Sequence, residues 1–332
     1  MFIQGNFMKN ILLVALSLTL FFSIEIEAIE DKGLSNEPSK NFIASLQQNQ
    51  WIHGSQDCKT NKDPAIEVFQ YDESSYVLRQ NKCLSYEAPF IYVLIGDEKI
   101  LVVDTGATEN ADEFPLYKTI QSLNHKHPTQ GQKSEREILV IHSHSHSDHY
   151  GADSQFTGQE NVTVVAANSL AINEFFDFKE WPNQQTKLEL GGRSITIIPT
   201  PGHQEEAISI YDTQTKWLLT GDTFYPGYIY VKDWNDYKNS ISRLVSFTNN
   251  HKVSAILGAH IEMTNRAGEY YEVGTIFQPE ESSLLLMPID LVTLNEKLDQ
   301  TDEPVKISLD GLIVEPLGAL PKLISNIVRW FI

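Results

Sequence analysis

The residues of this chain that could do chemistry concentrate in one run, residues 142–149, which reads His-Ser-His-Ser-His-Ser-Asp-His. Four of the chain's ten histidines and one aspartate fall within these eight residues. Imidazole nitrogens and carboxylate oxygens together suit zinc and related borderline metal ions. The run therefore predicts a metal site.

The spacing within the run predicts two metal positions rather than one. Residues 138–141 are apolar and read as a buried strand that leads directly into the run. Residues two apart in an extended segment project the same way, so His144 and His146 can bind one metal ion together. Asp148 and His149 come where a helix is expected to begin, so they point elsewhere and can reach a second ion.

Three further candidate ligands lie just after predicted strands, each close to a glycine. They are His203 after Pro201-Gly202, Asp222 after Gly221, and His260 after Gly258-Ala259. Ligands that arrive at one edge from several strand ends form a composite site, as is usual in layered α/β folds.

The elements that must position these residues are short apolar runs alternating with amphipathic ones. Strands are predicted at residues 65–70, 76–79, 90–95, 100–103, 138–141, 162–166, 187–190, 194–199, 207–211, 216–220 and 253–257. Helices are predicted at residues 113–123, 169–176 and 234–247. Strand-rich blocks with helices thus occur on both sides of residue 185. This pattern predicts an α/β protein, a four-layer αββα sandwich of two sheets covered by outer helices.

The sandwich is expected to span residues 65–262, with residues 29–64 as an N-terminal extension. Residues 263–332 read as a C-terminal α/β extension that packs on the domain. It comprises a helix at 289–298, a hairpin within 305–314 and an apolar amphipathic helix at 321–332. The alternatives for that last helix are a dimer contact or a wall of a substrate channel.

The N-terminus has the pattern of a secretory signal at residues 1–28. Lys9 precedes the apolar run 11–24, and the small residue Ala28 closes a short polar stretch. The apolar run is short for a membrane span, although an uncleaved anchor is the alternative. We therefore expect a secreted or periplasmic protein.

The only cysteines, Cys58 and Cys83, both lie in the part expected to be exported. In an oxidising compartment they can form one disulfide, which would close a loop of about 25 residues. Two unpaired thiols are the alternative. Neither cysteine has a metal-binding spacing.

The charge of the chain excludes some partners. Acidic residues outnumber basic ones by 44 to 25, giving a formal net charge of −19. Binding phosphates needs clustered lysine and arginine, so we expect no nucleic-acid partner and no stable membrane association after export. A small-molecule substrate is expected, and the oligomeric state stays open.

The order of the candidate ligands resembles a known family. The run His144-Ser-His146-Ser-Asp148-His149, followed by His203, Asp222 and His260, is similar to the metallo-β-lactamase superfamily. Asp104, in Val-Asp-Thr-Gly, also matches an early aspartate motif of that family. The resemblance covers residues 65–262 and implies the same αββα fold.

The resemblance implies a role for each of these residues. His144, His146 and His203 would hold one Zn²⁺ ion, and Asp148, His149 and His260 a second. Asp222 would bridge the two ions, and Asp104 would orient a ligand histidine. Two ions about 3.5–4 Å apart need such a shared ligand to offset their repulsion. A bridging hydroxide would then be the nucleophile, oriented by the catalytic Asp148.

Asp222 narrows the expected reaction. Similar β-lactamases carry cysteine or serine here, whereas an aspartate resembles glyoxalase II-type thioesterases, lactonases and other hydrolases. We therefore expect a zinc-dependent hydrolase of an ester, lactone, thioester or amide. The alternatives are a β-lactamase acting on β-lactam antibiotics and a non-catalytic metal-binding protein.

Aromatic residues follow Asp222 closely and invite two interpretations. They could line an apolar pocket, or Tyr225 or Tyr228 could donate a hydrogen bond to a developing oxyanion. Core or rim packing is the plainer interpretation. His142, at the strand end, is expected to pack or to support the site rather than to bind metal.

Overall fold

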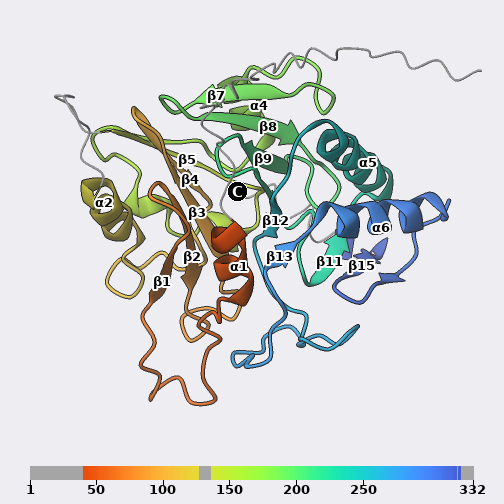
Figure 1. Ribbon diagram of the computed structural model, residues 1–332, viewed down its shortest axis with the longest axis horizontal. Coiled ribbons are helices and arrows are strands. Elements are labelled where there is room, and N and C mark those ends of the chain that lie inside the picture. The colour runs from red at the N-terminus through yellow and green to blue at the C-terminus, as the bar shows by residue number, and fades with distance from the viewer. Residues whose placement is uncertain (1–39, 127–135, 320, 323–332) are drawn as a thin grey trace, which may run out of the picture. The chain divides into compact units, whose positions relative to one another are not determined.

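Two six-stranded sheets form the centre of the protein, seen in a computed structural model that describes residues 40–126, 136–319 and 321–322 (Figure 1). The first sheet has the order β1-β2-β3-β4-β5-β6, with bounds β1 Ile66–Gln70, β2 Ser75–Gln80, β3 Phe90–Ile95, β4 Lys99–Val103, β5 Glu137–Ile141 and β6 Val162–Val164. The second has the order β13-β12-β10-β9-β8-β7, with bounds β7 Thr186–Glu189, β8 Ser194–Pro199, β9 Ile208–Asp212, β10 Trp217–Gly221, β12 Ala255–Gly258 and β13 Leu285–Leu286.

The strand directions bring several chain segments to one edge of each sheet. Strands β1 to β4 pair antiparallel, whereas β4, β5 and β6 are parallel. In the second sheet β7 to β10 pair antiparallel and β10 is parallel to β12. The segments that follow β4 and β5 therefore leave the same edge, as do those that follow β8, β10 and β12.

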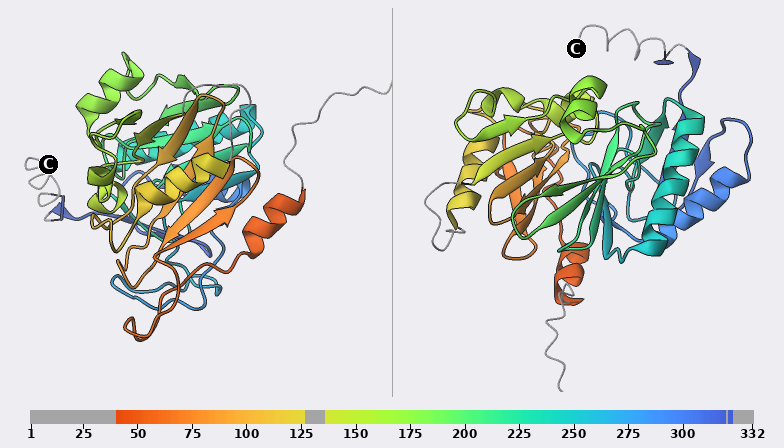
Figure 2. Two further views of the ribbon diagram at one scale, coloured as in Figure 1. Left: turned by 90° about the vertical axis from the view of Figure 1, so that its left-hand side faces the viewer. Right: turned by 90° about the horizontal axis from the view of Figure 1, so that it is seen from above.

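Helices and a small third sheet complete the fold. The helices are α1 Lys40–Gln48, α2 Leu116–Lys126, α3 Ser147–Tyr150, the 3₁₀ turn η1 Asp153–Gln155, α4 Ser169–Phe176, α5 Trp234–Asn250 and α6 Pro288–Asp299. The third sheet has the order β11-β15-β14, with bounds β11 Tyr228–Val231, β14 Ile307–Ser308 and β15 Ile313–Pro316. Viewed from above in Figure 2, α2 lies outside the first sheet, and α5 and α6 lie outside the second.

The sequence builds these layers by placing apolar residues on both faces of the central strands. In β3, Phe90, Tyr92 and Leu94 face the second sheet, while Ile91 and Val93 face the opposite side, where α2 packs. Successive side chains of a strand point to opposite faces, so a continuously apolar strand can support two packed layers. Full burial of such a side chain contributes about 1.5–3 kcal/mol.

The outer helices cover the sheets with single apolar stripes. Leu116 and Ile120 of α2 pack on the first sheet, and Tyr237, Ile241 and Leu244 of α5 pack on the second. These spacings of three and four residues put the side chains on one helical face. The predicted four-layer αββα sandwich is therefore confirmed.

A buried arginine, Arg193, forms hydrogen bonds to both sheets. Arg193 Nε and Nη2 donate to the two carboxylate oxygens of Asp212, at 2.9 and 2.6 Å. Nη2 also donates to Ser75 Oγ, and Nη1 donates to the carbonyl oxygens of Ser74 and Ile95 in the first sheet. Because both partners of the ion pair are buried, loss of either one would leave an uncompensated charge.

Several elements differ from the prediction. Helix α2 begins at Leu116 rather than at residue 113, because Phe114 precedes Pro115 and a residue before proline disfavours helical dihedral angles. The strand β11 and the helix α1 were not predicted. The hairpin predicted within residues 305–314 is present as β14 and β15.

The predicted signal at residues 1–28 lies outside the described residues. Residues 323–332 of the predicted terminal helix also lie outside them. Within the described ranges, none of the helices has the length and apolar character needed to cross a bilayer.

The predicted disulfide is present between Cys58 and Cys83, with their Cα atoms 5.3 Å apart. It ties the segment before β1 to the loop that follows β2, so it closes a ring of 25 residues in sequence. Such a ring limits the freedom of the unfolded chain.

Replacing both cysteines, in a Cys58→Ser/Cys83→Ser variant, is expected to lower the free energy of unfolding by about 3 kcal/mol. Guanidinium denaturation of the oxidised wild type and of the variant measures the difference. Wild type kept under reductant serves as the control and should unfold with the variant. Equal midpoints for the variant and the oxidised wild type would contradict this role for the disulfide.

Candidate metal centre

Five strands deliver the predicted site residues to one region of the molecule. The residues and the strands that they follow are Asp104 after β4, His144, His146, Asp148 and His149 after β5, His203 after β8, Asp222 after β10, and His260 after β12. All seven predicted ligands come together in two neighbouring groups. Within each group, the atoms able to bind a metal lie within 4.8 Å of one another.

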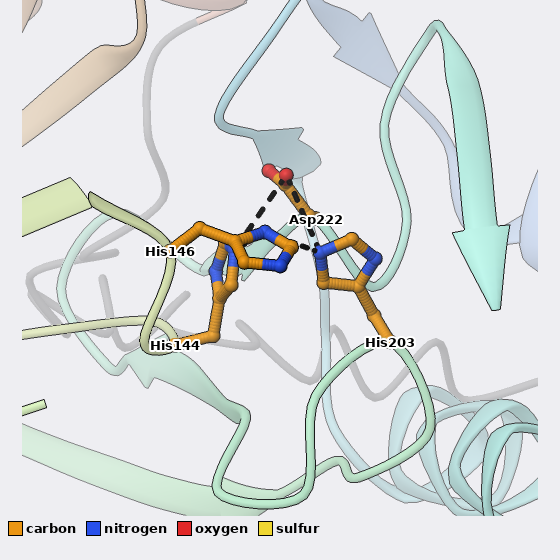
Figure 3. A group of neighbouring side chains, drawn as sticks. All are labelled: His144, His146, His203 and Asp222. Atoms are coloured by element: carbon orange, nitrogen blue, oxygen red, sulfur yellow. Dashed lines mark hydrogen bonds and ion pairs between the residues drawn. The ribbon is translucent and has the colours of Figure 1, made fainter. Parts of the chain in front are cut away.

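The first group contains His144, His146, His203 and Asp222 (Figure 3). Three ring nitrogens converge in it, because His146 Nδ1 lies 2.9 Å from His144 Nε2 and 3.1 Å from His203 Nε2. Figure 3 shows the carboxylate of Asp222 directed at these rings. Three imidazoles with a carboxylate beside them form a donor set of the kind that zinc prefers.

The second group contains Asp148, His149 and His260. Asp148 Oδ2 lies 3.3 Å from Nε2 of each histidine, and the two Nε2 atoms are 3.3 Å apart. Helix α3 begins at Ser147, so Asp148 and His149 lie in a helical turn that follows the segment of His144 and His146. The ring centroids of His144 and His149 are 4.0 Å apart, so the two groups adjoin. The division of the run between two groups agrees with the prediction from its spacing.

Asp222 faces both groups at once. Its Oδ2 lies 3.7 Å from Nε2 of both His144 and His203, while its Oδ1 lies 3.6 Å from His149 Nε2 and 3.5 Å from His260 Nε2. Oδ1 is buried and accepts no hydrogen bond from any residue that the structure describes. A buried carboxylate oxygen without a partner is costly, and a bound cation would satisfy it.

The backbone next to Asp222 requires glycine. Gly221 has a φ of +50°, and a Cβ atom there would lie 2.5 Å from the Cβ of Ser143. Glycine at this position lets β10 end against the segment that follows β5. The absence of a side chain therefore brings Asp222 close to the histidine run.

Asp104 orients the second group, as predicted. Its Oδ2 lies 2.9 Å from His149 Nδ1, and its Oδ1 accepts a hydrogen bond of 2.7 Å from the backbone N–H of Ser143. Asp104 has a φ of +69°, in the left-handed region that aspartate tolerates better than most residues. This conformation turns its carboxylate back toward the end of β5.

Backbone carbonyl groups orient two further histidines. His203 Nδ1 lies 2.7 Å from the carbonyl oxygen of Tyr230, and His260 Nδ1 lies 2.9 Å from that of Glu87. A carbonyl oxygen only accepts, so each Nδ1 carries a proton, and Nε2 is the nitrogen directed into the site. Main-chain carbonyl groups leave no signal in the sequence, so these contacts could not be foreseen.

Ser143 and Gln204 are two site residues that sequence reasoning missed. Ser143 Oγ lies 2.9 Å from Asp104 Oδ2, 3.1 Å from His144 Nδ1 and 3.2 Å from His149 Nδ1. Gln204 Nε2 lies 2.5 Å from His146 Nε2. Their position in sequence beside predicted ligands was the one available signal.

The histidines of the first group favour the neutral form. Burial lowers the pKa of His144 well below its ordinary value and lowers that of His146 to about 3. Burial also lowers the pKa of His203, although Asp222 opposes the shift. A neutral imidazole has a free lone pair, which is the form that binds a metal ion.

In the second group, nearby carboxylates raise the pKa values of both histidines. Burial alone would lower the histidine pKa values, but Asp148, Asp104 and Asp222 raise the pKa of His149 well above its ordinary value. Asp222 and Asp148 raise that of His260 to about 9. Burial of Asp222 is in turn outweighed by the nearby histidines, which hold its pKa well below the ordinary range. Asp222 therefore stays ionised, as a metal-binding carboxylate must.

His142 lies outside both groups. Its Nδ1 lies 2.9 Å from the carbonyl oxygen of Val165, and its Nε2 lies 2.9 Å from Asp153 Oδ1. These contacts connect the end of β5 to Val165 and to Asp153 of η1. The expectation that His142 does not bind metal agrees with this placement.

The structure favours the plainer interpretation of these aromatic residues, because the hydroxyls of Tyr225 and Tyr228 contact other protein groups. Tyr225 is buried, and its hydroxyl oxygen lies 3.0 Å from the Tyr228 carbonyl oxygen and 3.1 Å from Glu262 Oε2. The hydroxyl of Tyr228 donates to Glu315 Oε2 at 2.7 Å. Both hydroxyls are committed to structural partners, because β11 and the chain beyond residue 262 fold back onto this side of the second sheet.

Replacing Asp104 with asparagine is expected to weaken Zn²⁺ binding at the second group about 10–100-fold, because His149 would lose its charged orienting partner. Zn²⁺ titration against a chromophoric chelator measures this affinity. Asp153→Asn is a matched control, since it alters an aspartate–histidine pair of the same 2.9 Å length whose members lie outside both groups. Equal Zn²⁺ affinities in the two variants would disprove the role of Asp104.

Comparison with known proteins identifies the family. The model of the family "Metallo-beta-lactamase superfamily" matches residues 87–251. The human acyl-coenzyme A thioesterase MBLAC2 is 25% identical over 207 residues, covering 51% of this chain and 72% of that protein. The hydroxyacylglutathione hydrolase of Bartonella tribocorum is 26% identical over 133 residues, covering 40% of this chain and 47% of that protein.

Among solved structures, a metallo-beta-lactamase from Pontibacter korlensis aligns with a TM-score of 0.45 and 15% identity, covering 71% of this chain and all of that one. The family model covers the run after β5, His203 and Asp222, and its curated relatives are hydrolases. The chain belongs to the metallo-beta-lactamase superfamily.

Proposed function

We propose that this protein is a dinuclear, metal-dependent hydrolase that cleaves an ester, lactone, thioester or amide bond, with a thioester as the first candidate. The observation that carries the proposal is the carboxylate of Asp222. One of its oxygens faces two histidines of the first group, and the other faces two histidines of the second. A shared carboxylate offsets the repulsion between two cations held close together.

The donor set supports zinc as the metal. His144, His146 and His203 would hold one ion, and Asp148, His149 and His260 would hold the other, with Asp222 shared between them. Nitrogen and carboxylate ligands suit zinc. Metal ions bound here would supply Lewis acidity toward a substrate carbonyl and would lower the pKa of a bound water molecule.

Asp148 is the residue that we assign to catalysis. Its side chain is 17% exposed, whereas those of His149 and His260 are almost fully buried, so Asp148 lies on the side of the group that a substrate can reach. Burial would raise its pKa, but His149 and His260 hold the pKa well below the ordinary range. An ionised carboxylate in this position can orient an attacking water and accept its proton.

The preference for a thioester rests on Asp222 and on the relatives. The two kinds of curated relative are named as an acyl-coenzyme A thioesterase and a hydroxyacylglutathione hydrolase. The aspartate at position 222 stands where β-lactamases of similar sequence carry cysteine or serine. Both observations favour thioester hydrolysis over β-lactam hydrolysis as the main activity.

We also propose that the protein works after export, in the periplasm or outside the cell. The signal-like pattern of residues 1–28 motivates this proposal, and the disulfide between Cys58 and Cys83 supports it. Disulfides form and persist in oxidising compartments. Fractionation of cells that produce the full chain tests the proposal, and protein confined to the cytoplasm would refute it.

Replacing a ligand or the catalytic carboxylate is expected to abolish hydrolysis while the fold is kept. Asp148→Asn should lower kcat by at least about 10²-fold, because removal of a positioned acid–base group costs about 10²–10⁴-fold. His144→Ala should lower kcat at least as much, because it removes a proposed ligand of the first ion. Turnover of an acyl thioester, with thermal denaturation as the folding check, measures the effect. His251→Ala, at the end of α5, is the matched control and should keep full activity. Wild-type turnover by His144→Ala would rule out the proposed centre.

A substrate panel tests the type of bond that is cleaved. Metal-loaded protein should hydrolyse acyl thioesters, and simple esters or lactones to a lesser degree, much faster than a chromogenic cephalosporin. Initial rates at equal substrate concentration give the ranking. Efficient turnover of the cephalosporin, with none of any ester, lactone or thioester, would instead favour the β-lactamase alternative.

A further inference from the structure

Two site histidines, His144 and His146, have outward-facing nitrogens with neither a carbonyl nor a carboxylate partner among the described residues. That of His144 lies 3.1 Å from the hydroxyl oxygen of Ser143, and that of His146 contacts Gln204. The outer nitrogens of His203 and His260 meet backbone carbonyl oxygens, and that of His149 meets Asp104. The outer nitrogen of His146, Nε2, instead lies 2.5 Å from the side-chain amide of Gln204. This inference rests on the proposed metal centre.

The direction of His146 determines which of its nitrogens must carry a proton. Nδ1 is the nitrogen that converges with Nε2 of His144 and of His203, so Nδ1 is the atom that would bind a metal ion. A neutral imidazole that ligates through one nitrogen carries its proton on the other. Nε2 of His146 must then be a donor, and a buried donor needs an acceptor.

Gln204 can supply that acceptor. Its side chain is buried, and its Oε1 atom has no hydrogen-bond partner in the described part of the chain. The amide nitrogen, which can only donate, is the atom that faces His146 Nε2. Turning the amide by 180° about its Cγ–Cδ bond exchanges the two atoms, and it pairs the lone Oε1 with the Nε2–H group. One rotation therefore satisfies both groups.

We propose that Gln204 is a positioning residue that holds His146 in the Nδ1-ligating tautomer by accepting a hydrogen bond from its Nε2–H group. The amide nitrogen released by this rotation needs an acceptor of its own. Gln204 also lines a cavity of about 240 Å³ whose other lining residues include Glu205, Asp233 and Asp236, together with Lys232 and Lys322.

Hydrogen bonds fix the loop that carries Gln204 relative to the histidine run, so the loop holds Gln204 beside His146. Glu206 Oε1 accepts a hydrogen bond of 3.1 Å from the N–H group of Ser145, which lies between His144 and His146. The carbonyl oxygen of Gln204 accepts from the N–H group of Gly202 at 3.1 Å. Gly202 has a φ of +138°, and a Cβ there would lie 2.5 Å from the backbone of Tyr237. The loop is therefore held between α5 and the histidine run.

Three variants test this role by Zn²⁺ binding rather than by activity. Gln204→Met keeps the length of the side chain but removes the acceptor, and it should weaken one of the two Zn²⁺ equivalents about 10–100-fold. Gln204→Glu keeps an acceptor in the same place and should retain the wild-type affinity. Gln214→Met removes an exposed glutamine that bonds to Ser74, so it controls for the substitution itself.

Competition with a chromophoric chelator gives the Zn²⁺ affinities, and thermal denaturation reports the folding of each variant. Wild-type affinity in Gln204→Met, or equal losses in Gln204→Met and Gln204→Glu, would overturn the proposal. If wild-type protein binds no Zn²⁺, the proposed function itself fails. If wild type binds two equivalents and Gln204→Met binds both equally well, only the role of Gln204 fails.

A measurement on the wild-type protein keeps the proposal testable even if Gln204→Met does not fold. Long-range ¹H–¹⁵N spectra of Zn²⁺-loaded protein report which nitrogen of each histidine carries a proton. We expect His146 to be protonated at Nε2, with slow exchange of that proton with solvent. A proton on Nδ1 of His146, or fast exchange of the Nε2 proton, would overturn the proposal.

Discussion

The buried carboxylate of Asp222 is the feature on which the rest of the candidate site depends. Its two oxygens face separate histidine pairs at 3.5–3.7 Å, so one side chain defines the distance between the two groups. One of those oxygens is buried without a hydrogen bond among the described residues, a state that a protein keeps only with a compensating charge nearby. The surrounding histidines supply part of that charge, and bound cations would supply more.

The fold holds this carboxylate in place through contacts between the sheets. Asp222 follows a strand of the second sheet, whereas the histidine run follows a strand of the first. Gly221 lets the two segments approach, and the buried pair of Arg193 with Asp212 connects the same two sheets. Because the site is shared between two layers, its geometry depends on how they pack. Stability of the sandwich and integrity of the site are therefore linked.

Much of the fold could be predicted because its central strands are apolar on both faces and its outer helices on one. This periodicity indicates two buried sheets with helical cover, and both are present. Errors arose where local sequence is ambiguous. Proline at position 115 delays the start of α2, although the apolar spacing extends further back. Residues 228–231 are aromatic and apolar, a composition that suits a pocket as well as a strand. Their pairing with β15, far along the chain, decided between the two.

The sequence by itself determined which side chains could bind metal, because donor chemistry and spacing are local properties of the run 144–149 and of Asp222. It also determined that Cys58 and Cys83 could pair. Only the tertiary structure decided how the ligands are held. The carbonyl of Tyr230 and the amide of Gln204 reach histidines through chain folding, and nothing in their own residue types indicates it. The chemistry of a side chain follows from its residue type alone. The orientation of a ligand depends on atoms that the fold brings together from distant strands.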